Sequence, residues 1–141
     1  RVGWSSFGAA VWRDRLYVAR PLASKIAEID LASLAVLREI PVGYGVRDLE
    51  IDERRGILYA GNYFDGTVDA VDIATGERRK RAVVGQLVRG LMFDSPRDRL
   101  WIATGCGTKV IDPPCWLDPV GAPALDQAPA CVQGGTSPPI H

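Results

Sequence analysis

The chain has 141 residues, 17 basic and 17 acidic side chains, and a mean hydropathy of +0.01. This length suits one ordinary domain with a sizeable core, and the balanced charge excludes a strongly basic surface for nucleic acid or an anionic membrane. The apolar residues occur in short alternating runs, none of which approaches the ~18–20 continuous apolar residues of a transmembrane helix, so we expect neither a nucleic-acid partner nor a transmembrane segment.

The sequence repeats with a period of 42 residues. Leu16-Tyr17-Val18-Ala19 returns as Leu58-Tyr59-Ala60-Gly61 and again as Leu100-Trp101-Ile102-Ala103. A further set of apolar residues recurs at the same offset, namely Ile26, Val68 and Val110. A period of ~40–45 residues is typical of one four-stranded propeller blade, so the repeat predicts a stack of such blades.

In chain order, the segments between turn residues alternate apolar and polar side chains, which predicts half-buried strands. The first unit has such segments at 7–12, 15–19, 25–30 and 36–42. The second unit has them at 46–52, 57–61, 67–72 and 78–84. The third unit has them at 88–94, 99–103 and 108–112, and it has no counterpart of the fourth strand.

Short connections rich in turn-forming residues join these segments, as at Asp65-Gly66, where glycine provides a positive φ at little cost. One segment, 31–40, is dense in Ala and Leu and would also suit a helix. Its counterpart one period later, 73–82, contains Thr75-Gly76 and a run of basic residues. We therefore expect strands at both places.

Three features resemble the YVTN-type β-propeller repeats, which are relatives of the NHL and WD-type blades. They are the Leu-Tyr-Val-Ala strand, the stretch 67–76, and the Val-Gly pairs at Val42-Gly43 and Val84-Gly85. The resemblance covers roughly residues 2–112 and implies an all-β, propeller-like stack of four-stranded antiparallel blades. Where the family commonly has proline before the first strand, this chain has Val46-Arg47 and Val88-Arg89. A propeller does not define a function, because the fold serves binders, scaffolds and enzymes alike.

The units lie at about 4–45, 46–87 and 88–112, and they are fewer than the ~4–8 blades of a closed ring. Residues 1–3, Arg-Val-Gly, resemble the end of an earlier fourth strand, and the chain begins with Arg1 rather than Met. We therefore expect an incomplete ring with an open sheet face at each end. Upstream blades, a protein partner or a second copy of the chain are expected to cover these faces, because exposed apolar faces and sheet edges promote aggregation.

After Asp112 the repeat ends, and 113–141 is rich in proline and glycine, which predicts an irregular tail. Trp116 and two cysteines in this tail favour packing on the propeller or on a partner. The candidate disulfide residues are Cys106, Cys115 and Cys131. We expect one disulfide and one spare thiol rather than buried free thiols, and the sequence does not show which two cysteines pair. A disulfide indicates an extracytoplasmic location, in the periplasm or at the cell surface.

The candidate ligand-binding residues are Arg47 and Arg89. In a propeller of this kind the first strand of each blade is innermost, so the loop before it places both arginines near one mouth of the central channel. Two guanidinium groups there would clamp a carboxylate or a phosphate through bidentate hydrogen bonds. The alternative is that each arginine pairs with a nearby carboxylate, such as that of Asp48, or with backbone carbonyls of a neighbouring blade.

Other recurring features have structural explanations. Tyr17, Tyr59 and Trp101 occupy one blade position, which favours packing between blades over stacking on a ligand. The basic run at 78–81 lies on an outer strand, where solvated charges prevent strand addition.

No catalytic or metal-binding constellation recurs in the units. The only histidine is His141, so we expect no Ser/His/Asp or Cys/His site, and the cysteine spacing does not suit zinc. Asn62 and Asp65 have oxygens that would suit calcium, but the other units lack acidic counterparts. We expect no metal, no cofactor and no catalysis by this segment.

The sequence therefore favours a non-catalytic binding or scaffolding propeller segment, an accessory part of a larger extracytoplasmic protein or complex. Two alternatives stay open. One is the C-terminal part of a propeller enzyme, lactonase-like or quinone-dependent, whose active site lies mostly upstream. The other is a partial propeller that self-association completes into a homo-oligomer.

Overall fold

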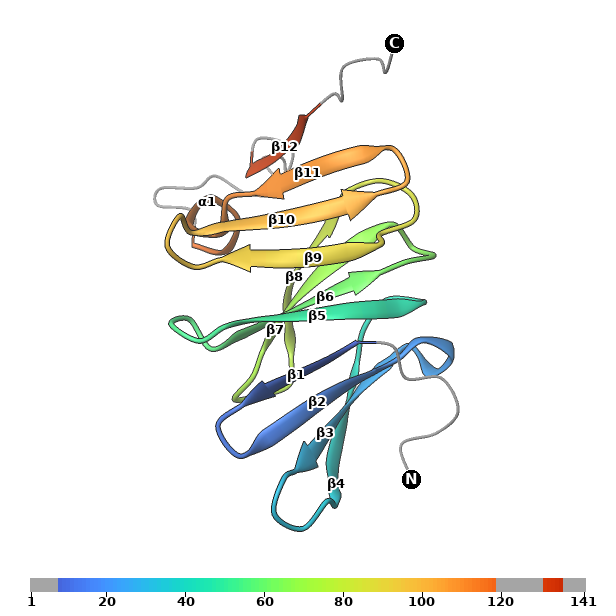
Figure 1. The fold of residues 1–141 in the computed structure, drawn as a ribbon, viewed down its shortest axis with the longest axis vertical. Helices are drawn as coiled ribbons and strands as arrows, with labels where there is room; N and C mark the ends of the chain where they lie inside the picture. Colours follow the sequence, from blue (N-terminus) through green and yellow to red (C-terminus); the bar gives the residue numbers. More distant parts are fainter. Residues whose placement is uncertain (1–7, 119–130, 136–141) are drawn as a thin grey trace.

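The computed structural model describes residues 8–118 and 131–135. They form three four-stranded antiparallel sheets that follow one another along the long axis of the molecule (Figure 1). The first strands of the three sheets, β1 (Ala9–Trp12), β5 (Val46–Asp52) and β9 (Gly90–Asp94), lie side by side along one edge of the stack. The predicted all-β, propeller-like stack of four-stranded blades is confirmed.

In the first sheet, β2 (Arg15–Arg20), β3 (Lys25–Asp30) and β4 (Val36–Pro41) follow β1 in chain order. A short 3-10 turn, Pro21–Ala23, joins β2 to β3. The segment 31–40, which would also suit a helix, forms a turn and β4. The predicted strand start at Phe7 and the strand-like residues 1–3 lie outside the described residues.

In the second sheet, β6 (Ile57–Asn62), β7 (Thr67–Asp72) and β8 (Arg78–Val83) follow β5. Every residue of β6 is buried, because a neighbouring sheet covers each of its faces. The basic run 78–81 on β8 is exposed, as predicted for an outer strand, and two of its arginines pair with carboxylates, Arg79 with Asp118 and Arg81 with Asp69.

In the third sheet, β10 (Arg99–Thr104), β11 (Gly107–Ile111) and β12 (Val132–Gly135) follow β9. The prediction that this unit lacks a fourth strand is therefore wrong. The segment predicted as an irregular tail contains a short helix, α1 (Pro113–Leu117), and then β12, which pairs with β11. The 42-residue period misses β12 because this strand is four residues long and does not follow β11 directly.

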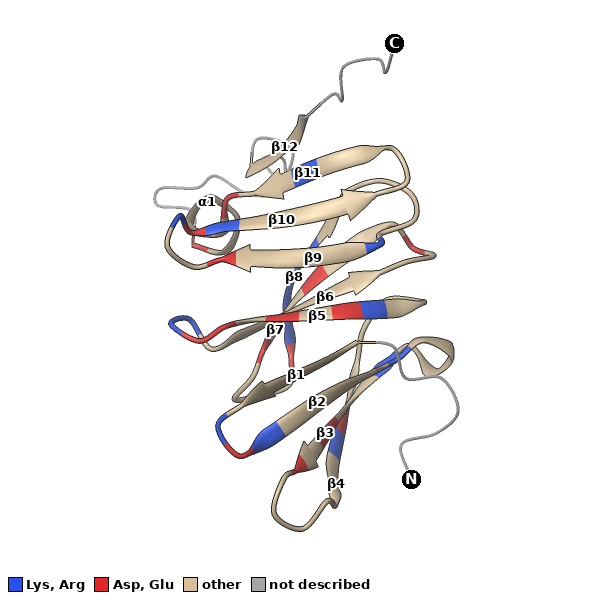
Figure 2. Cartoon of the chain, viewed as in Figure 1, with Lys and Arg blue, Asp and Glu red and all other residues tan. Residues whose placement is uncertain are grey.

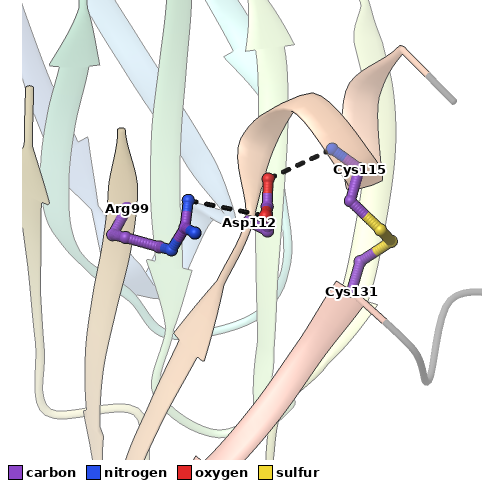
Figure 3. The surroundings of a disulfide bond; sticks show 4 residues. All are labelled: Arg99, Asp112, Cys115 and Cys131. Atoms are coloured by element: carbon purple, nitrogen blue, oxygen red, sulfur yellow. Dashed lines mark hydrogen bonds and ion pairs between the residues drawn. A yellow bond between two sulfur atoms is a disulfide. The ribbon is translucent and has the colours of Figure 1, made fainter. Parts of the chain in front are cut away.

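A disulfide between Cys115 and Cys131 joins α1 to the residue before β12 (Figure 3). Asp112 organises this junction: its Oδ1 accepts a hydrogen bond from the Cys115 backbone N–H at 3.2 Å, and its Oδ2 lies 3.4 Å from the Arg99 guanidinium. The Asp112 backbone N–H donates to the Cys131 carbonyl at 3.0 Å. Cys106, the third candidate, is an exposed free thiol.

The strand register corrects one match from the repeat. Gly107 pairs with Thr104, whereas in the second sheet Thr67 pairs with Asn62, so the hairpin of the third sheet is shorter by two residues. The counterpart of Val68 is consequently Thr108, and Val110 occupies the place of Ala70. Matching residues at a constant spacing of 42 does not reveal that this hairpin is two residues shorter, because the residue at the matched position, Val110, is also apolar.

The core lies between successive sheets. Tyr17 and Tyr59 are fully buried, each against the sheet that follows its own, as the prediction of packing between blades requires. The cluster between the first and second sheets consists of Tyr17, Ala19, Ile26, Ile40, Val42, Val46, Leu49, Leu58, Ala60, Val71 and Ile73. The cluster between the second and third sheets also takes in the tail, because Trp116 and Leu117 of α1 and Cys131 are buried in it.

Candidate functional site

The connections between sheets and two of the hairpins within them lie along one side of the stack, at the ends of the strands (Figure 1). We call this surface the loop face (residues 42–47, 62–67, 84–89 and 104–107). Three hydrogen bonds join the first connection to the hairpin of the second sheet. The Tyr63 N–H donates to the Gly45 carbonyl at 2.9 Å, the Asp65 N–H to the Tyr44 carbonyl at 3.4 Å, and the Tyr44 N–H to Asp65 Oδ2 at 2.7 Å. The next connection continues the layer, since the Val84 N–H donates to the Gly66 carbonyl and the Gly105 N–H to the Gln86 carbonyl. The loop face is thus one hydrogen-bonded surface.

Both candidate arginines lie on this surface. Arg47 is exposed and is the extra residue of a β-bulge, because Val46 pairs with Asn62 while Asp48 pairs with Gly61. Arg89 is exposed and directly precedes β9. Their segments are adjacent, because Asp48 Oδ2 accepts a hydrogen bond from the Leu91 N–H at 2.8 Å. The structure thus brings the two segments together, and the capture of an anion by their guanidinium groups stays a prediction.

An aromatic cluster that the sequence interpretation missed lies beside Arg47. The rings of Tyr44 and Phe64 stack with centroids 5.0 Å apart, and Tyr63 meets Phe64 edge-on at 5.0 Å. The Arg47 guanidinium carbon lies 5.2 Å from the centre of the Tyr63 ring, within range of a cation–π contact. Phe64 is 58% exposed and Tyr44 is 47% exposed. These four side chains, Tyr44, Arg47, Tyr63 and Phe64, are called the arginine–aromatic cluster below.

The signal that would have revealed this cluster is a departure from the repeat. The hairpins of the first and third sheets have Pro21-Leu22 and Gly105-Cys106 in place of Tyr63-Phe64. The following connection has Gln86 where the first has Tyr44. Residues that a blade needs recur every 42 positions, so aromatic residues that do not recur are not required by the blade.

Gly45 allows the cluster to pack closely. Its φ of +75° is a conformation that other residues adopt at a cost. A Cβ atom at this position would lie only 2.5 Å from Cδ2 of Phe64. The Phe64 ring therefore packs directly on the backbone of the connection between the first two sheets.

A buried polar network supports the hairpin between β6 and β7 on the side facing the core. Asn62 Nδ2 donates to Thr67 Oγ1 and to Asp69 Oδ2, both at 3.0 Å, and the Gly43 N–H donates to Asp69 Oδ2 at 2.9 Å. Arg81 donates to both carboxylate oxygens of Asp69, at 2.6 and 2.9 Å, and this hydrogen-bonded carboxylate raises the pKa of the Arg81 guanidinium. Asn62 and Asp69 are fully buried. The network fixes the hairpin to β8 and to the connection from the first sheet.

The network also shows what Asn62 and Asp65, the calcium candidates, contact. The Asn62 amide binds Thr67 and Asp69, and the Asp65 carboxylate accepts the Tyr44 N–H. Among residues 8–118 and 131–135, no group of three or more His, Cys, Asp or Glu side chains is placed to hold a metal ion.

A second surface is the outward face of the third sheet. Met92, Trp101, Val110 and Gln133 form one row across all four strands, because Trp101 pairs with Met92 and Val110, and Val110 pairs with Gln133. Met92 is 55% exposed and Trp101 is 37% exposed, whereas the counterparts of Trp101, Tyr17 and Tyr59, are fully buried. We call this surface the open sheet face.

The open sheet face contains a small hollow of about 60 Å³ next to the Arg99–Asp112 ion pair, lined by Arg99, Val110, Asp112, Cys131 and Gln133. Sites for small molecules are commonly ~300–1,000 Å³ in volume. This hollow suits a side chain of a packed partner better than a substrate. Within the described ranges, no helix is long and apolar enough to cross a membrane.

No protein-family model and no curated protein sequence matches the chain. Solved structures do match. The chain is similar to Kuenenia stuttgartiensis hydrazine synthase, with 21% identity and a TM-score of 0.71 over 76% of this chain and 32% of that chain. It is also similar to the computationally designed proteins Ika4 and Ika8, each with 21% identity and a TM-score of 0.66 over 77% of this chain, and over 66% and 33% of those chains. The chain therefore spans about a third of the first solved protein that it matches, and a likeness at this identity shows the fold alone.

Proposed function

We propose that the chain is a non-catalytic binding or scaffolding segment of a larger extracytoplasmic β-propeller of the YVTN type, and that its open sheet face packs against a further blade. The observation that carries the proposal is the exposure of Trp101 at a position that is fully buried in the first two sheets. The blade comes from the rest of a larger protein, from a protein partner or from a second copy of the chain.

The two covered interfaces in the molecule support this proposal. Tyr17 and Tyr59 each bury an aromatic ring against the next sheet, and Tyr59 stacks on Trp116 and contacts Phe93. Trp101, Met92 and Val110 present the corresponding row to solvent. Burying apolar area contributes roughly 25 cal/mol per Å², so packing another blade on the open sheet face would stabilise the molecule.

The Arg99–Asp112 ion pair on the open sheet face is compatible with a covered surface. In the first sheet, Arg15 and Asp30 form the equivalent pair at 2.8 Å beside the interface with the second sheet. A charged pair at this place therefore occurs next to a packed blade. The Cys115–Cys131 disulfide supports the extracytoplasmic part of the proposal, because disulfides persist in oxidising compartments.

Sedimentation velocity of the 141-residue chain tests the proposal. The wild type is expected to self-associate through the open sheet face, and Trp101→Glu is expected to shift it towards a monomer, because a carboxylate cannot be buried in a sheet interface without a partner. Val83→Glu is the matched control, since Val83 is 79% exposed on the outer strand β8. A wild type that stays monomeric over the accessible concentrations and unfolds cooperatively would show that the open sheet face needs no cover.

A further inference from the structure

We propose that the loop face is a second binding site, separate from the open sheet face, for an acidic protein segment that carries an aromatic or large apolar side chain. The site consists of the arginine–aromatic cluster together with Arg89. The acidic side chains of the bound segment contact the two guanidinium groups, and its apolar side chain covers Phe64 and Tyr44. This inference goes beyond the proposed scaffolding function and does not depend on it.

The arginine–aromatic cluster is not part of the blade architecture. The hairpins of the three sheets differ at the two positions that Tyr63 and Phe64 occupy, where the first sheet has Pro21-Leu22 and the third has Gly105-Cys106. All three sheets nevertheless have the same strand order. The large exposed rings of the second sheet therefore serve something other than the fold.

The aromatic rings of the cluster are held in place before a ligand binds. Phe64 packs on Gly45, stacks on Tyr44 and meets Tyr63 edge-on. The hairpin beneath them is bonded to the connection on one side and, through Asn62 and Asp69, to Arg81 on the other. Rigid aromatic side chains lose little conformational entropy on binding, which is one reason that aromatic residues and arginine dominate binding energy at protein interfaces.

Two arginine side chains supply the positive charge of the site. Arg47 is the extra residue of a β-bulge, a feature that redirects a side chain, and its guanidinium lies against Tyr63. The described ion pairs do not include Arg89. Carboxylates are the side-chain partners that match guanidinium geometry.

The charge pattern favours a protein segment over a nucleic acid. The chain has 17 basic and 17 acidic side chains, and Figure 2 shows both signs intermixed along the strands and turns. A polyanion needs a continuous basic surface that neutralises many phosphates. One guanidinium group beside the aromatic rings, and the exposed Arg89 on the adjacent segment, match a short acidic stretch with one large apolar side chain.

Fluorescence anisotropy with labelled polypeptides tests the inference on the full chain. The probe is a random copolymer of glutamate and tyrosine, and the comparison probes are polyglutamate, a copolymer of lysine and tyrosine, and heparin. We expect the glutamate–tyrosine copolymer to bind most tightly, since only it offers both carboxylates and rings. Binding is expected to weaken as salt rises, because the guanidinium–carboxylate contacts are exposed.

The variants Phe64→Ala and Arg47→Glu are each expected to weaken binding of this probe by about tenfold or more. Arg47→Glu changes an exposed side chain and keeps the test valid if Phe64→Ala lowers stability. The matched controls, Leu34→Ala in the turn before β4 of the first sheet and Arg97→Ala in a turn of the third sheet, alter exposed residues outside the site and are expected to bind as the wild type does.

Trp101→Glu is expected to retain probe binding, which separates this inference from the proposed function. Equal binding of the lysine–tyrosine copolymer, absence of binding, or equal losses in the control variants would overturn the inference. Equally tight binding of heparin would also overturn it, because the site would then select anionic polymers in general rather than an acidic protein segment.

Discussion

At the scale of single residues, Arg55 and Asp98 tie the second sheet to the third. The Arg55 guanidinium donates two hydrogen bonds to the Asp98 carboxylate, at 2.7 and 2.6 Å, and a further one to Asp52 Oδ2 at 2.7 Å. Hydrogen bonds from Arg55 hold the pKa of Asp98 below its usual range. Burial, reinforced by Asp52, raises the pKa of the Tyr59 phenol, which donates to Asp52 at 3.4 Å. This network joins the turns of two neighbouring sheets.

We predict that Asp98→Asn lowers the free energy of unfolding by about 2 kcal/mol at neutral pH, because it removes a charge-assisted, two-point contact. Asparagine keeps the backbone conformation, since it tolerates the positive φ of 52° at this position. The folded-state pKa of Asp98 is lowered, so its contribution is present above the unfolded value of ~3.9 and is lost as the pH falls through the folded value.

Urea unfolding of the wild type and Asp98→Asn between neutral pH and strongly acidic pH measures this difference. The two stability curves are expected to converge at acidic pH. Asp14→Asn is the control, because the Asp14 side chain is 70% exposed and its pair with Arg15 is expected to contribute little. A difference that stays constant with pH would mean that Asp98 acts through backbone conformation rather than charge.

At the scale of elements, β12 completes the third sheet and depends on the junction around α1. Val132 pairs with Ile111 and Gln133 with Val110, so β12 covers the edge of β11 with only four residues. The Cys115–Cys131 disulfide spans a sequence separation of 16 and fixes the start of this strand. Short strands have few ladder hydrogen bonds, so the covalent link matters more here than in the other sheets.

We predict that the double variant Cys115→Ser, Cys131→Ser loses about 3 kcal/mol of stability, the loss of loop-closure entropy expected for a disulfide of this separation. Hydrogen exchange is expected to show faster exchange at β11 amides and little change in β2 and β3. Cys106→Ser is the control, because Cys106 is exposed and unpaired in the described chain. A reductant that leaves the wild type as stable as before would contradict the role given to the disulfide.

In the whole molecule, the apolar clusters of the described residues join each sheet to its neighbour in the stack. One apolar cluster joins the first sheet to the second, and another joins the second to the third. This arrangement is typical of repeat architectures, in which stability is approximately a sum of unit and interface contributions. The destabilising effect of a substitution at one interface is therefore expected to decrease with distance along the stack.

We predict that Leu100→Ala destabilises the chain by about 3 kcal/mol, because Leu100 is fully buried between the second and third sheets and its removal leaves a cavity. Hydrogen exchange should accelerate most in β9–β11, less in β6 and β7, and least in β2 and β3. Leu22→Ala, at a residue that is 74% exposed, serves as the control. Equal acceleration in all three sheets would show that the stack unfolds as a single cooperative unit.

The blade architecture can be predicted from the amino-acid pattern. Alternation of apolar and polar residues marks a strand with one face in a core, and its return every 42 residues marks a stack of equivalent sheets. The buried positions of Tyr17 and Tyr59 follow from this pattern, as do the exposed outer strand β8 and the adjacent segments of Arg47 and Arg89. Each of these features is repeated or local, so a single chain carries enough information to predict it.

Other features depend on contacts between distant, unrepeated segments and become visible only in the folded chain. The strand β12 has no counterpart at the 42-residue spacing. The pairing of Cys115 with Cys131 depends on the position of α1, which contains Cys115. The two-residue shortening of the third hairpin reassigns Val110, because pairing follows hydrogen-bond register rather than sequence offset. The arginine–aromatic cluster forms only when a connection, a hairpin and a bulge meet on the loop face. Periodicity describes what every blade shares, whereas such a site arises where one blade differs from the others and its loops pack together.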